Sequence, residues 1–89
     1  MRIEEAIEKL KSAHLDVALK NYDVLVVFSG TTKVGEIQKR NHCHHIREVD
    51  GNWCVYDGGQ LPKAEFSDLE LAVEQTIKLI SEAKCNENV

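Results

Sequence analysis

Apolar and polar residues follow two different periods along the chain, and the change of period divides it into two helical ends and a β-rich middle. Apolar residues recur at three- and four-residue steps in residues 2–14 and again in residues 66–84, which predicts two amphipathic helices. The run 23–29 is instead short, β-branched and aromatic, and bounded by turn residues. It predicts a central strand with both faces substantially buried.

The first helix is predicted over residues 2–14, and its apolar stripe consists of Ile3, Ala6, Ile7, Leu10 and, half-buried at its end, His14. The stripe breaks after His14, and residues 15–20 alternate between apolar and polar, the period of a strand with one solvent-facing side. Together with the central run they predict a hairpin over residues 15–28 with a turn at Asn21. In the alternative, the helix continues to about Asn21 and this strand is absent.

The middle of the chain predicts one or two further strands and a hairpin. Residues 32–40 favour a strand whose Val34 and Ile37 lie on opposite faces unless Gly35 forms a bulge. A turn at Asn41-His42 then leads to a strand over 43–49, although residues 32–49 could form one long bent strand. Asp50-Gly51 is the strongest hairpin signal, because both central residues of a type I′ turn need positive φ. It pairs 43–49 with 52–57.

The last third of the chain predicts a loop and a helix. Gly58 to Pro62 favour a loop, and Ser67 with Glu70 matches a capping box preceded by a hydrophobic staple between Phe66 and Leu71. The helix is expected to end near Lys84, with residues 85–89 as a frayed tail. Its core-facing stripe consists of Leu69, Ala72, Val73, Thr76, Ile77, Ile80 and Ala83.

The order is therefore helix, three to five antiparallel strands, helix. Neither helix can bury its apolar stripe alone, and packing both on one face of the sheet buries all of these surfaces together. The sequence predicts an α+β protein, a two-layer sandwich with one domain over residues 1–84.

Composition and charge narrow the function classes. With 89 residues, 43% of them apolar and 29% charged, the chain is typical of one globular domain. Val24–Phe28, the longest apolar run, is too short to span a membrane, and the acidic N-terminus lacks a signal region. Three cysteines form an odd set, which favours a reducing compartment and a cytoplasmic location. Residues 33–47 carry four cations and one anion, a balance of +3, which leaves −7 for the rest of a chain of net charge −4.

The densest candidate chemistry is Asn41-His42-Cys43-His44-His45, since histidine and cysteine bind metals and carry protons. A two-residue turn at Asp50-Gly51 fixes which residues share a face. One face carries Cys43, His45, Arg47, Val49, Cys54 and Tyr56, and the other carries His44, Ile46, Glu48, Trp53, Val55 and Asp57. Trp53, Val55 and Ile46 make the second face the better candidate for the core.

A zinc-binding domain using Cys43, His45 and Cys54, with His42 or His44 as a further ligand, is the first alternative function. Zinc prefers four ligands, and the sequence offers three on this face and no C-x-x-C pair. A Cys43–Cys54 disulfide is disfavoured, because the register separates these residues along the ladder and a bridge needs Cα atoms within about 7 Å.

Enzymatic sites are weakly supported. No nucleophile has both a neighbouring base and an obvious orienting carboxylate, so hydrolase chemistry is not predicted. A less favoured alternative is a ribonuclease in which His42, His44 or His45 acts with Lys39 or Arg40 as phosphate binders. Nucleic-acid binding is disfavoured because the second helix is acidic, with Asp68, Glu70, Glu74 and Glu82.

The leading hypothesis is a small non-enzymatic binding or inhibitor protein that acts by protein–protein contact and needs no cofactor. Its size is typical of phage or mobile-element products. The contact surface is expected on an unpaired edge strand or on an exposed sheet face bearing His45, Arg47, Tyr56 and Cys54, with Lys39 and Arg40 as further binding residues. The same surface could form a homodimer.

Overall fold

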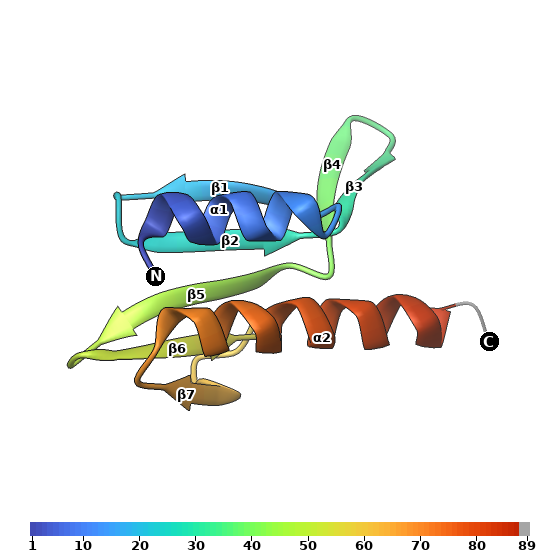
Figure 1. The fold of residues 1–89 in the computed structure, drawn as a ribbon. Coiled ribbons are helices and arrows are strands. Elements are labelled where there is room, and N and C mark those ends of the chain that lie inside the picture. Colours follow the sequence, from blue (N-terminus) through green and yellow to red (C-terminus); the bar gives the residue numbers. More distant parts are fainter. Residues whose placement is uncertain (88–89) are drawn as a thin grey trace.

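The structure is a computed structural model that describes the backbone of residues 1–87 and the side chains of residues 1–85, and it confirms the α+β class (Figure 1). The elements in order are α1 (Ile3–Ser12), β1 (Asp16–Lys20), β2 (Val24–Phe28), β3 (Gly30–Val34), β4 (Ile37–Asn41), β5 (His44–Val49), β6 (Asn52–Tyr56), β7 (Ala64–Phe66) and α2 (Leu69–Glu87).

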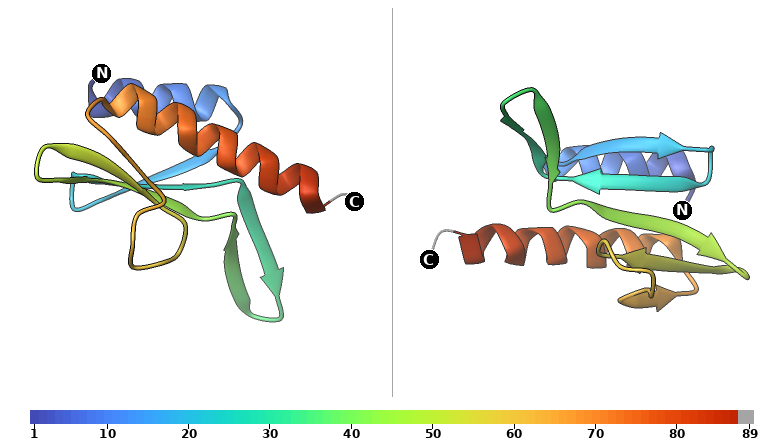
Figure 2. Two further views of the ribbon diagram at one scale, coloured as in Figure 1. Left: turned by 90° about the horizontal axis from the view of Figure 1, so that it is seen from below. Right: turned by 180° about the vertical axis from the view of Figure 1, so that it is seen from behind.

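Five strands form one antiparallel sheet in the order β1-β2-β5-β6-β7. The apolar run predicted as a central strand is β2, which pairs with β1 on one side and β5 on the other. In the described part of the chain, strands β3 and β4 pair only with each other and form a separate hairpin over residues 30–41, here called the arm. The arm leaves the sheet on the side away from the helices (Figure 2, left).

Both helices lie on one face of the sheet, as the two-layer prediction required (Figure 2). Four helix-facing residues at the centre of the three inner strands are fully buried: Leu25 and Val27 on β2, Ile46 on β5 and Val55 on β6. They meet buried residues of the helices and the segment after α1, namely Ala6, Leu10, Leu15, Leu69, Ala72, Val73 and Ile80. This continuous apolar layer is the main source of stability, since it removes the most apolar surface from water.

Two predictions about strand pairing are confirmed. Residues 16–20 form β1, so the alternative that extends the first helix to Asn21 is wrong. Asp50 and Gly51 both have positive φ, 52° and 85°, and the pairs His45–Tyr56 and Arg47–Cys54 follow the predicted register. The two faces of the β5–β6 hairpin are therefore those that the sequence predicted.

The prediction of one strand over residues 32–40 is wrong, and so is the single bent strand over 32–49. Gly35 and Glu36 form a two-residue turn, and Val34 pairs directly with Ile37 across it. Gly35 occupies the first turn position with φ 65°, where a type II′ turn requires positive φ and glycine meets no steric cost. The alternative of a bulge at Gly35 is wrong too, because the chain reverses there.

The helix boundaries need three corrections. Helix α1 ends at Ser12, and His14 lies beyond it with φ 63° and an exposed side chain, so it is not a half-buried end of the stripe. Helix α2 begins at Leu69, later than the Ser67–Glu70 capping box requires. The carboxylate of Asp68 accepts the backbone N–H of Glu70 at 3.1 Å and caps the helix instead.

The predicted staple residue Phe66 belongs to a short strand, β7, that the sequence analysis missed. Helix α2 continues to Glu87, so part of the predicted tail 85–89 is helical, and residues 88 and 89 lie outside the described residues. Within the described residues, neither helix has the length and apolar character needed to cross a membrane.

Candidate functional site

The face of the sheet away from the helices carries a groove of about 630 Å³ that is open to solvent. We call it the open-face groove. It is lined by Lys20, Asn21, Asp23, Val24, His45, Arg47, Tyr56, Gly58, Gly59 and Gln60. These residues come from the end of β1, from the β1–β2 turn, from the solvent-facing side of β2, β5 and β6, and from the loop after β6. A volume of this size suits a small ligand or one to a few side chains of a partner.

Two projecting segments border the open face. The loop 57–63, which leads from β6 to β7, hangs below the sheet beside the groove (Figure 2, left). The arm projects on the same side, at the end of β2 where Phe28 lies. The open face is thus a trough with the loop along one side and the arm at one end.

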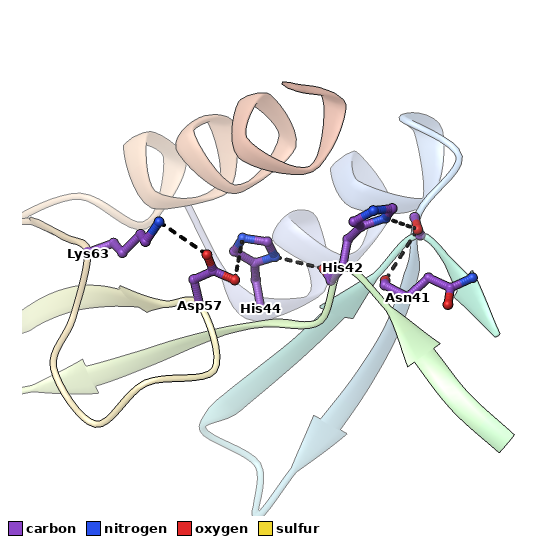
Figure 3. A network of polar contacts seen from close by, with 6 residues as sticks. Asn41, His42, His44, Asp57 and Lys63 are labelled. Carbon is purple, nitrogen blue, oxygen red and sulfur yellow. Dashed lines mark hydrogen bonds and ion pairs between the residues drawn. The ribbon is translucent and has the colours of Figure 1, made fainter. Parts of the chain in front are cut away.

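A chain of polar contacts anchors loop 57–63 (Figure 3). His44, which is only 3% exposed, donates from Nδ1 to the carbonyl oxygen of His42 at 2.7 Å. Its Nε2 lies 3.5 Å from Asp57 Oδ1, and Lys63 Nζ lies 3.2 Å from the other oxygen of the same carboxylate. Asp57 and Lys63 stand at the two ends of the loop, so these contacts hold one wall of the groove in place.

The root of the arm is fixed by a second set of contacts. Ser29 Oγ lies 2.8 Å from His42 Nδ1 and 3.2 Å from the Asn41 carbonyl oxygen, which also accepts the Ser29 backbone N–H at 2.9 Å. The guanidinium of Arg40 lies 4.8 Å from the centre of the Phe28 ring, a cation–π distance. Residues 29 and 40–42 therefore tie the arm to the end of β2.

The groove is cationic in an acidic protein. Lys20 and Arg47 line it against one carboxylate, Asp23, and Arg40 adds positive charge nearby. Burial lowers the pKa of His45, and the charges of Lys20, Arg40 and His44 lower it further. His45 is consequently a neutral imidazole at pH 7, able to donate one hydrogen bond and accept another.

This lowered pKa makes stability depend on pH. In the unfolded chain His45 binds a proton near its ordinary pKa of 6.5, whereas the folded protein resists protonation. The free energy of unfolding is therefore expected to fall as pH drops below 6.5 toward the lower pKa of the folded state, and to be unaffected by His45 above that window. His45→Gln should flatten this part of the profile, measured by urea unfolding across the same pH range. An equally steep profile in the variant would assign the pH dependence to other groups.

Exposed apolar side chains stand at the rim of the groove. Tyr22 is 89% exposed and lies between the lining residues Asn21 and Asp23, and Leu61 is 83% exposed and follows the lining residue Gln60. Exposed apolar surface of this kind can be covered by a protein partner, so Tyr22 and Leu61 offer apolar contact area beside the polar groove.

The structure brings together three of the five residues expected at a binding surface. His45, Arg47 and Tyr56 line the groove. Arg40 packs on Phe28 at the end of the open face, and Lys39, the next residue on β4, lies on the opposite face of the arm. Sequence reasoning missed the contributions of Lys20 and of Gly58 to Gln60. The Gly-Gly pair signalled a loop but not where the loop would fold.

The histidines and cysteines are dispersed. His44 lies on the helix-facing side of β5, His45 on the open side, and His42 in the turn before them. Among the described residues, the structure contains no group of three or more His, Cys, Asp or Glu side chains that could hold a metal, so Cys43, His45 and Cys54 do not form one. Burial also raises the pKa of the Cys43 thiol, although Arg40 opposes it, and a thiol must lose its proton to bind zinc. All three cysteines are free.

A scan against models of protein families and searches of curated proteins and of solved structures found no match for this chain. Its function is therefore inferred from the geometry of the site.

Proposed function

We propose that this chain is a small non-enzymatic binding or inhibitor protein that acts by protein–protein contact, with the open-face groove as its contact surface. The observation that carries the proposal is the groove itself, where His45, Arg47 and Tyr56 line a concavity bordered by exposed Tyr22 and Leu61. Tyrosine and arginine are enriched among the residues that dominate binding energy at protein interfaces.

Charge favours an acidic partner segment. Lys20 and Arg47 in the groove and Arg40 at the end of the open face attract carboxylates, and the neutral His45 can donate a hydrogen bond to one. The apolar rim would contact the flanking residues of the partner. Because the polar contacts of His44 and Asp57 already hold the loop wall, binding requires little reorganisation of this chain.

Photo-crosslinking from inside the groove tests the proposal. A photoreactive amino acid at Gln60, a residue that lines the groove, is expected to give a discrete crosslinked protein in the cells that produce this chain. The same amino acid at Glu82, an exposed position on α2, is the matched control and should not give that product. Arg47→Glu combined with the Gln60 probe should remove the product. Failure to obtain it from Gln60, or equal yields from Gln60 and Glu82, would contradict the proposal.

A further inference from the structure

The two edges of the five-stranded sheet differ in how open they are to pairing with another strand. Strand β7 at one edge has three residues and follows Pro62 closely, so it offers little backbone for pairing. Strand β1 at the other edge has five residues, pairs with β2 without a bulge and contains no proline. Within residues 1–87, no strand pairs with the outer N–H and C=O groups of β1.

The sequence of β1 is complementary to itself when two copies run antiparallel. In Asp16-Val17-Ala18-Leu19-Lys20, an antiparallel alignment centred on Ala18 places Asp16 opposite the partner's Lys20, and Lys20 opposite the partner's Asp16. We propose that two copies of this chain pair along β1 in this register, with a twofold axis between the two Ala18 residues. The interface is isologous and closes as a dimer. It joins two five-stranded sheets into one of ten strands.

Burial and charge in the single chain agree with this pairing. Asp16 and Lys20 lie on the open face of β1, and neither pairs with an oppositely charged side chain among the described residues. On the helix-facing side, Leu19 remains 43% exposed at the edge of the core. In the dimer it lies opposite the partner's Val17, so pairing covers apolar surface that one chain leaves in water.

The dimer also places each arm beside the partner's groove. The arm stands at the end of the sheet where β1 begins (Figure 1). In an antiparallel pair that end lies next to the partner's β1–β2 turn, which carries the exposed Tyr22 and lines the partner's groove. The arm projects from the face of the sheet away from the helices (Figure 2, left), and the groove residues His45 and Arg47 lie on that same face. Each groove would thus gain a wall from the other chain.

Reversing the charges of β1 tests the register directly. Asp16→Lys places two cation pairs at the interface and Lys20→Asp places two anion pairs, so each variant alone should raise the dimer dissociation constant about tenfold or more. A mixture of the two variants should form a heterodimer, because all facing charges are then opposite. The double variant should regain the wild-type dissociation constant. Native mass spectrometry of untagged protein separates these species by mass.

Three results would overturn the proposal: a wild-type protein that stays monomeric at micromolar concentration, single variants that dimerise as tightly as wild type, or a mixture that yields no heterodimer. The two charged positions face solvent, and circular dichroism checks that each variant keeps its fold. A single variant that unfolded would leave the double variant to decide, since that protein keeps the charge composition of wild type and restores both pairs. A crosslink from Gln60 counts for the groove only where the captured protein differs in mass from this chain, so the groove and the dimer can fail separately.

Discussion

Ile46→Ala is expected to lower the free energy of unfolding by about 2–5 kcal/mol, the range for removing a large aliphatic side chain from a packed core. Ile46 is fully buried on β5, the middle strand of the sheet, and it pairs with Leu25 of β2 and Val55 of β6, both fully buried too. The cavity would open between the sheet and the helices, where the surrounding side chains already fill the space. Urea unfolding followed by circular dichroism measures the change.

The arm supplies a control with the same chemistry. Ile37 also lies on a strand, but its side chain is 65% exposed, so Ile37→Ala removes the same atoms from a site that buries few of them. Its free energy of unfolding should stay within about 0.5 kcal/mol of wild type. Similar losses in the two variants would mean that strand propensity, and not burial on the helix-facing side of the sheet, determines the cost.

The features predicted correctly from the sequence are those that depend on neighbouring residues or on a repeating pattern of side chains. An Asp-Gly pair has one low-energy geometry in a two-residue hairpin turn, and Asp50-Gly51 adopts it. This local preference was enough to predict which residues of β5 and β6 face each other. The apolar run of β2 and the alternation of β1 were also informative. Successive side chains of a strand point to opposite faces of the sheet, so the spacing of apolar residues shows directly which faces are buried.

The errors arise where distant parts of the chain decide the structure. Strand β7 has three residues, too few for a period, and it exists because β6 offers an edge to pair with. Gly35 is compatible with either a bulge or a turn. It forms a turn because, within the described residues, β3 and β4 pair with each other and not with the sheet. The N-cap of α2 is Asp68 and not the predicted Ser67, because the chain just before it, Ala64–Phe66, forms β7.

The site was predictable in part for the same reason. Register placed His45, Arg47 and Tyr56 on one face, and all three line the groove. The groove itself depends on the path of loop 57–63, which is set by contacts of Asp57 with His44 and Lys63. The predicted register already placed His44 and Asp57 on one face of the β5–β6 hairpin, so their contact follows from a local pattern. The contact of Asp57 with Lys63 depends on the path of the loop, which no local pattern signals.

Arg47→Glu is expected to weaken binding of the partner captured through Gln60 by about 2 kcal/mol or more, which is at least about thirtyfold in Kd. Arg47 lies in the groove and is covered once a partner fills it, so its charge would act in a site with little water. The substitution removes the guanidinium that donates hydrogen bonds to carboxylates of the partner. It also adds a negative charge that repels an acidic partner segment. Because Arg47 faces solvent in the free protein, the variant should fold normally.

The matched control for this variant is Lys78→Glu, which changes the net charge by the same two units at an exposed position on α2, on the helical side of the molecule. Only long-range attraction should change there, and salt screens it, so Kd at physiological ionic strength should stay close to wild type. Equal losses for the two variants would show that total charge governs binding. A loss confined to Arg47→Glu, and reduced at high salt, would instead locate the electrostatic contact in the groove.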